Sequence, residues 1–120
     1  MTNPSRVLIV DASSESREIL STLLARRGAT TLEAAEPRQA AELAELHQPD
    51  LIVFDADCDA SSTGAPTLRL HAAADRNGTP IVVLGTIRSS QISAASGQFV
   101  SKPYHYGPLI RKIESLLAAG

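Results

Sequence analysis

Three short runs of consecutive apolar residues, rich in β-branched side chains, constrain the fold of this chain more than any other feature. They are Val7–Val10, Leu51–Phe54 and Ile81–Leu84. A strand inside a parallel sheet is covered on both faces, so its side chains are apolar at every position rather than at every second one. Two weaker apolar runs, Thr30–Leu32 and Phe99–Val100, complete a set of five predicted strands.

Helical patterns fill the segments between these strands. Apolar stripes with the spacing of one helix face precede Gly28 and follow Pro37, and Pro108 is placed to open a last helix. The first two stripes are Ile19, Leu20, Leu23 and Leu24, then Ala40, Leu43, Ala44 and Leu46. Pro66–Ala74 is a weaker helix candidate. Ser89–Ser96 is a poor one, so we expect the fourth helix to be short.

The alternation of strands and helices predicts an α/β fold with a doubly wound sheet of five parallel strands. Right-handed crossovers place helices on both faces of such a sheet. The simplest strand order is 2-1-3-4-5, as in flavodoxin-like folds. A chain of 120 residues suits a single domain, which we expect to span residues 1–120.

Charge and composition argue against several classes of function. The formal net charge is −2, so no basic excess indicates binding to nucleic acid or to an anionic membrane. No apolar run is long enough to cross a bilayer, and the residues before the first strand do not resemble a signal peptide. The single cysteine, Cys58, excludes a disulfide framework and a multi-cysteine metal site. We therefore expect a cytoplasmic protein.

Polar residues follow the strands at the edge of the sheet where a ligand site is expected. In an open α/β sheet, ligands bind outside the carboxyl ends of the strands. The residues at these ends are Asp11, Asp55 with Asp57 close behind, Gly85 with Thr86, and Lys102. Crowded carboxylates repel one another, and a hard cation such as Mg²⁺ relieves the repulsion. A lysine opposite them can hold a phosphoryl oxygen, and an aspartate can attack phosphorus to form an acyl phosphate.

Four segments, in this order and at this spacing, resemble the receiver domain of bacterial two-component response regulators. They are Val7–Asp11, Pro49–Asp55, Pro80–Leu84 and Phe99–Pro103. The resemblance covers nearly the whole chain. It implies a signalling protein rather than an enzyme, which receives a phosphoryl group from a histidine kinase or a phosphotransfer protein and passes the signal to an output partner.

The resemblance also implies roles for individual residues. Asp55 is the expected phosphoacceptor, Lys102 the expected phosphate contact, and Asp11 a residue of the acidic pocket that holds Mg²⁺. The segment Lys102-Pro103 is expected to contain a cis peptide bond. Phe99 occupies the position of the aromatic switch residue, without a hydroxyl group.

The sequence departs from the family's usual pattern around this site. Receivers usually carry two adjacent acidic residues after the first strand, and here the second is Ala12. The end of the fourth strand usually carries Thr or Ser, and here that position is Gly85, with Thr86 one residue beyond. The stretch from Gly85 to Lys102 is shorter than usual by more than one helical turn. We therefore expect an atypical member with a shortened fourth helix.

Two interpretations of these departures remain open. The chain is a degenerate receiver with weak or no phosphorylation and weak or absent Mg²⁺ binding, and acts as a protein-interaction module. Alternatively, phosphorylation persists because Asp57 or Asp59 restores the metal site, with Asp11, Asp55 and Asp57 as the expected ligands.

Two other classes of function fit parts of the sequence. The segment Leu51–Asp57 fits the motif of haloacid-dehalogenase-type phosphatases, in which Asp55 would be the nucleophile and Asp57 the general acid. The serines after the first strand could cradle the phosphate of a flavin at a helix N-terminus. The phosphatase lacks its usual second acidic pair, and the flavin site lacks glycines and aromatic residues.

Overall fold

The computed structural model describes residues 4–58, 64–85 and 97–119. These residues form one sheet of five parallel strands in the order β2-β1-β3-β4-β5. The strands are β1 (Arg6–Val10), β2 (Thr30–Ala34), β3 (Leu51–Asp55), β4 (Ile81–Gly85) and β5 (Gly97–Ser101). The α-helices are α1 (Ser14–Arg26), α2 (Pro37–His47), α3 (Ala65–Asn77) and α5 (Tyr106–Ala119), and a short 3-10 helix, η1, spans Ala56–Cys58. The predicted fold class and strand order are confirmed.

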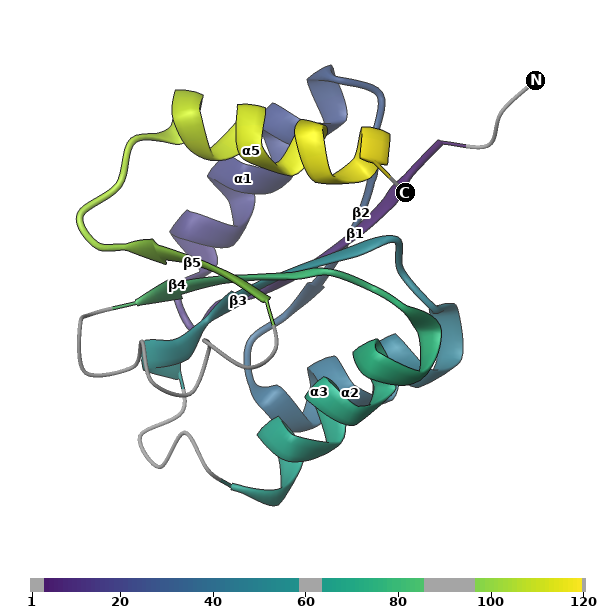
Figure 1. Ribbon diagram of the computed structural model, residues 1–120. Helices are drawn as coiled ribbons and strands as arrows, with labels where there is room; N and C mark the ends of the chain where they lie inside the picture. The colour runs from purple at the N-terminus through teal and green to yellow at the C-terminus, as the bar shows by residue number, and fades with distance from the viewer. Residues whose placement is uncertain (1–3, 59–63, 86–96, 120) are drawn as a thin grey trace.

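Helices cover both faces of the sheet, with α1 and α5 on one face and α2 and α3 on the other (Figure 1). The side chains of β1 alternate between two apolar cores, because successive residues of a strand point to opposite faces. Val7 and Ile9 pack with residues of α1 and α5. Leu8 and Val10 pack with residues of α2 and α3. All residues of β3 and β4 are buried, as their continuous apolar character predicts.

The register of the central strands brings the predicted site residues to one edge. Val10 of β1 lies beside Phe54 of β3, so Asp11 and Asp55 follow a matched pair of residues. Gly85 of β4 lies beside Ser101 of β5, so Lys102 follows directly. Parallel strands with matched ends therefore place these side chains at the same edge of the sheet.

The ends of the helices follow local sequence signals with one correction. Ser13 caps α1 by accepting a hydrogen bond from the Ser16 amide, and Gly28 and Gly78 adopt positive φ angles after α1 and α3. Helix α5 begins at Tyr106, not at Pro108. Proline is tolerated in the first turn of a helix because no intrahelical partner exists there for its missing amide hydrogen, so Pro108 does not have to be the first residue.

The apolar stripes are narrower than predicted. Leu46 of α2 is 75% exposed, and Ile19 of α1 is also exposed. Helix α2 instead buries Pro37, Ala40, Ala41 and Ala44. Small side chains let this helix lie close to the sheet, and Leu46 falls on its outer face. Ser89–Ser96, the predicted short fourth helix, lies outside the described residues and stays a prediction. Within the described part of the chain, every helix is too short or too polar to span a membrane.

His71 of α3 packs against the strand that carries Asp55. Its ring meets the Phe54 ring edge to face, with centroids 5.9 Å apart and planes at 83°. Burial lowers the pKa of His71 below the ordinary value of 6.5, and the Asp75 carboxylate opposes this change. The neutral imidazole is therefore the form that the folded protein favours.

We expect the stability of the protein to fall as the pH drops below about 6.5. The unfolded chain takes up a proton on His71 more readily than the folded protein, so protonation favours unfolding. The contribution of His71 is complete above the ordinary histidine pKa and is lost below it. Urea unfolding between pH 5 and pH 7.5 should show a weaker pH dependence for His71→Leu than for the wild type. His105→Gln, which changes an exposed histidine, serves as the control. Equal slopes for His71→Leu and the wild type would contradict this account.

Candidate functional site

An ion pair between Lys102 and Asp55 forms the centre of the site. Asp55 ends β3 and is only 7% exposed. The Nζ atom of Lys102 donates hydrogen bonds to Oδ1 and Oδ2 of Asp55 at 2.9 and 3.0 Å. The Lys102 amide also donates to the carbonyl oxygen of Gly85 at 2.9 Å. This hydrogen bond fixes the backbone of Lys102 beside the end of β4, which is the strand between β3 and β5.

Asp57 takes part in the same cluster. Its amide donates to Oδ1 of Asp55 at 2.9 Å, which closes a tight turn at the start of η1. Its Oδ2 atom accepts a hydrogen bond from Nζ of Lys102 at 3.0 Å. The lysine thus binds three carboxylate oxygens on two aspartates, and the exposed side chain of Asp57 forms the outer wall of the cluster.

Asp11 supplies the second buried carboxylate of the site. It is 5% exposed, and its Oδ1 atom accepts a hydrogen bond from the Ser13 amide at 2.9 Å. Burial raises the pKa of the Asp11 carboxyl, and the nearby Asp55 carboxylate raises it further. The Ser13 amide and the Lys102 charge oppose this rise. Asp11 and Asp55 are therefore close enough for the Asp55 carboxylate to disfavour the charge of Asp11.

The surrounding electrostatics favour a permanent charge on Lys102. Burial disfavours the ammonium ion, but the hydrogen bonds that it donates to Asp55 and Asp57 outweigh this effect and raise the Lys102 pKa above its ordinary range. Tyr104 lies close by, two residues beyond Lys102 and after the cis Lys102-Pro103 bond. Burial raises the pKa of Tyr104 to about 12, and the ring of Tyr106 meets that of Tyr104 edge to face at 5.6 Å.

The structure brings together four of the residues that the sequence indicated: Asp11, Asp55, Asp57 and Lys102. Gly85 stands at the end of β4 between them, but Thr86 and Asp59 lie outside the described residues. Phe99 of β5 is half-buried against the core on the side of α2 and α3. The roles assigned to these residues stay predictions.

Two residues of the site were missed in the sequence. Arg17 of α1 donates a hydrogen bond from Nη1 to the carbonyl oxygen of Asp11 at 2.6 Å. The charge of Asp11 raises the pKa of Tyr104, and the charge of Lys102 lowers it. Tyr104 could have been found from its place two residues after Lys102. Arg17 carries no such signal, because it acts on a main-chain atom six residues away.

The donor set can accommodate Mg²⁺ only in part. Mg²⁺ is commonly bound by one or two carboxylates, with water and phosphate oxygens completing the coordination. Asp11 and Asp55 are two such carboxylates at one sheet edge. Among the described residues, however, no group of three or more His, Cys, Asp or Glu side chains is arranged to hold a metal. Asp11 and Asp55 are the residues that would hold a magnesium ion here, and the role of Asp57 as a third ligand stays a prediction.

The family of the chain follows from comparison with known proteins. The family model for the response regulator receiver domain matches residues 7–114. The chain therefore belongs to the response regulator receiver domain family. Receiver domains are signalling domains that generally interact with histidine kinases or phosphotransfer proteins. This assignment favours the receiver interpretation over a haloacid-dehalogenase-type phosphatase or a flavin-binding protein.

Relatives of known name and structure agree with this assignment. The transcriptional regulatory protein PdtaR of Mycobacterium tuberculosis (strain H37Rv) is 31% identical over 123 residues, which cover 92% of this chain and 56% of PdtaR. The chain thus spans about half the length of that relative. A CheY-like receiver domain protein from Methanospirillum hungatei JF-1 has a TM-score of 0.82 at 22% identity and covers 97% of this chain and 95% of its own. Chemotaxis protein CheY4 of Vibrio cholerae has a TM-score of 0.77 at 22% identity, over 94% and 98%. The two structures share the fold.

Replacing the buried Asp11 carboxylate should stabilise the protein at neutral pH. Because the folded-state pKa of Asp11 is raised above 3.8, its contribution to stability is present at low pH and is lost as the pH rises through that folded-state pKa. We expect Asp11→Asn, which keeps the acceptor for the Ser13 amide, to raise the free energy of unfolding at pH 7 by about 1 kcal/mol. The gain should vanish below about pH 4, where the Asp11 carboxyl group becomes protonated in both the folded and the unfolded protein.

The matched control for this prediction is Asp50→Asn. Asp50 is exposed and also accepts a hydrogen bond from a main-chain amide, that of Arg6, at 2.8 Å. We expect no gain in stability from this variant. A loss of stability in Asp11→Asn at pH 7 would show that the Asp11 carboxylate is a net stabilising charge.

Proposed function

We propose that this receiver domain acts mainly as a protein-interaction module, and that Asp55 is a weak acceptor of a phosphoryl group from a histidine kinase or a phosphotransfer protein. In the transfer itself, a carboxylate oxygen of Asp55 would attack phosphorus, and the bond from phosphorus to the donor's histidine nitrogen would break. Lys102 would bind an oxygen of the transferred group. A magnesium ion held by Asp11 and Asp55 would supply charge neutralisation.

The observation that carries the proposal is the glycine at the end of β4. Gly85 lies in the sheet between the strand that ends in Asp55 and the strand that leads to Lys102. Its carbonyl group binds the Lys102 amide, and it has no side chain to contact a phosphoryl group. A ligand shifts a conformational equilibrium only by its different affinity for the two states. Without a contact at Gly85, a phosphoryl group on Asp55 has less means of favouring an active state.

The acidic loop after β1 supports weak phosphorylation. Asp11 is the only carboxylate in the loop between β1 and α1. The residue after it is Ala12, which is exposed and has no oxygen ligand in its side chain. Affinity for hard cations rises with the number and charge of the oxygen ligands. Lys102 already neutralises part of the negative charge of Asp55, so the attraction for a second cation is smaller. A weakly bound metal would leave phosphoryl transfer slow.

The apolar ring of Phe99 supports weak signal transmission. The ring packs half-buried against the core between the sheet and helices α2 and α3. The ring has no hydroxyl group that could hydrogen-bond to water and favour an exposed position. Its packed position is therefore favoured with or without a ligand at Asp55. The amount of protein would then control the binding of an output partner more than phosphorylation would.

Restoring the missing acid should strengthen metal binding. We expect Ala12→Asp to bind Mg²⁺ about tenfold more tightly than the wild type, because a second carboxylate of the same loop joins Asp11. An NMR titration of the amide signals gives the affinity of each protein. Ala35→Asp is the matched control, because it adds the same charge at an exposed position just beyond β2. Equal affinities of Ala12→Asp and the wild type would support the alternative in which Asp57 or Asp59 already completes the metal site.

A phosphoryl mimic should change little beyond the site. We expect beryllofluoride with Mg²⁺ to shift the amide signals of Asp55 and its neighbours and to leave those of Phe99 and β5 almost unchanged. The pair of variants Gly85→Thr and Gly85→Ala distinguishes the role of a hydroxyl group from that of added bulk. Gly85→Thr alone should extend the shifts to Phe99. Large shifts at Phe99 in the wild type would contradict the proposed function and would point to Thr86 as the residue that senses the phosphoryl group.

A further inference from the structure

The loop that carries Asp11 is held by a side chain outside the pocket. The Nη1 atom of Arg17 donates to the main-chain carbonyl oxygen of Asp11 at 2.6 Å. Its Nε atom forms an ion pair with Oε1 of Glu33, the fourth residue of β2, at 3.4 Å. The Arg17 side chain is only 17% exposed. We infer that Arg17 is a positioning residue, which fixes the direction of the Asp11 carboxylate in the site.

The route from Arg17 to the carboxylate passes through one turn of backbone. The carbonyl group that Arg17 binds belongs to the peptide unit between Asp11 and Ala12. The next peptide unit supplies the Ser13 amide, which donates to Oδ1 of Asp11 at 2.9 Å. A rotation of the first unit would therefore move the donor that orients the carboxylate. Arg17 thus holds the turn from outside, while the Ser13 amide holds the carboxylate from inside.

Two further backbone bonds limit the freedom of this turn. The Asp11 amide donates to the carbonyl oxygen of Ala34 at the end of β2, at 3.0 Å. The Arg17 amide donates to the carbonyl oxygen of Ser13 at 3.1 Å, which starts helix α1. The carbonyl oxygen of Asp11 lies between these two fixed points, and Arg17 is the side chain that binds it. Loss of Arg17 should leave the strand and the helix in place and loosen the turn between them.

The chemistry of the guanidinium group suits this bridging role. Its planar fork presents several donors in fixed directions, so one side chain can bind a carbonyl oxygen and a carboxylate at the same time. Its hydrogen bond to the carbonyl is charge-assisted and stronger than a neutral one. The hydrogen bond of Arg17 goes to the main-chain carbonyl oxygen of Asp11, and the carboxylate itself is bound by the Ser13 amide. Arg17 therefore positions Asp11 through the backbone.

The position of Asp11 matters more here than in a loop with two acids. Ala12 provides no second carboxylate, so any Mg²⁺ bound at the proposed site depends on Asp11 and Asp55 together. Outer partners that orient a metal ligand commonly affect metal affinity by about 10–100-fold. This consequence for Mg²⁺ rests on the proposed function, whereas the effect of Arg17 on the Asp11–Ser13 hydrogen bond does not.

The experiment compares Arg17→Met, Arg17→Lys and Glu33→Gln with the wild type by NMR. In the metal-free protein, we expect Arg17→Met to move the Ser13 amide proton signal upfield and to speed its exchange with solvent, because its bond to Asp11 weakens. In a titration with MgCl₂, we expect the affinity of Arg17→Met to fall about tenfold. Arg17→Lys should recover only part of the Ser13 amide signal and part of the Mg²⁺ affinity, because an ammonium group lacks the planar fork of a guanidinium group. Glu33→Gln should change both in the same direction, by less.

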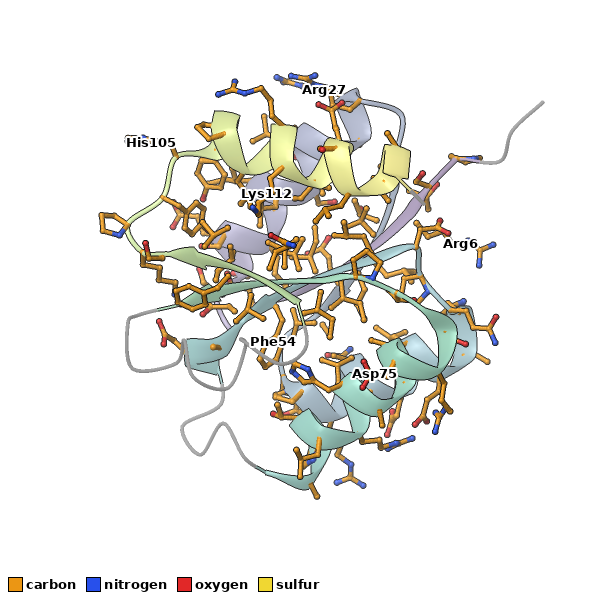
Figure 2. The ribbon with its side chains drawn as sticks, viewed as in Figure 1. Arg6, Arg27, Phe54, Asp75, His105 and Lys112 are labelled. Carbon is orange, nitrogen blue, oxygen red and sulfur yellow. The ribbon has the colours of Figure 1, made fainter. Side chains whose placement is uncertain are left out.

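The control removes a similar ion pair from the other end of the same helix. Arg27 pairs with Glu114 of α5 at 3.1 Å, and Figure 2 shows Arg27 on the outer side of α1 and α5, far from the loop that carries His105. Arg27→Met should leave the Ser13 signal and the Mg²⁺ affinity unchanged. A general loss of stability would affect both arginine variants, so thermal unfolding is measured for each.

The outcomes separate this inference from the proposed function. An Arg17→Met protein with the wild-type Ser13 signal and exchange rate would overturn the positioning role. A wild-type protein that binds no Mg²⁺ would contradict the metal part of the proposed function, and the metal-free Ser13 measurement would still decide the role of Arg17. If Arg17→Met does not fold, the same Ser13 measurement on Arg17→Lys and Glu33→Gln decides it, and wild-type signals in both would overturn the inference.

Discussion

The site depends on the neutralisation of buried carboxylates by one lysine. Parallel strands of matched register end together, so the residues that follow them are forced into one another's neighbourhood. Asp11 and Asp55 are both buried there, at a cost that rises when both are charged. Lys102 enters from β5 and binds Asp55 and the adjacent Asp57. The sheet can carry two acids at this edge because the lysine is held beside them by the bond from its amide to Gly85.

The same interaction supports the function that we propose for this receiver domain. A lysine that binds three carboxylate oxygens lowers the negative charge that would attract a metal ion, and Ala12 adds none in return. At the end of β4, the carbonyl oxygen of Gly85 accepts a hydrogen bond from the Lys102 amide. Gly85 has no side chain that could contact a phosphoryl group. The described strands and helices thus have the arrangement of a receiver, and we propose that the means of responding to phosphorylation are reduced.

Much of this arrangement could be predicted from the sequence, because it depends on backbone periodicity. The continuous apolar runs predicted that β1, β3 and β4 are buried strands. The alternation of strands and helices predicted the doubly wound sheet and its order, and strand-end positions predicted the grouping of Asp11, Asp55 and Lys102. Side-chain partners were harder to predict. The contact of Asp57 with Lys102 was not predicted, and its expected role as a metal ligand stays a prediction. The contact of Arg17 with a carbonyl oxygen, and the outward face of Leu46, depend on helix orientation that a pattern of apolar residues does not specify.

The most direct test of the account is the incubation of the protein with acetyl phosphate and Mg²⁺, followed by intact mass measurement. We expect only a small fraction of the wild-type protein to gain the mass of one phosphoryl group, and Asp55→Asn to gain none. Nearly complete phosphorylation of the wild type, absent in Asp55→Asn, would contradict the claim that this receiver is a weak phosphoryl acceptor.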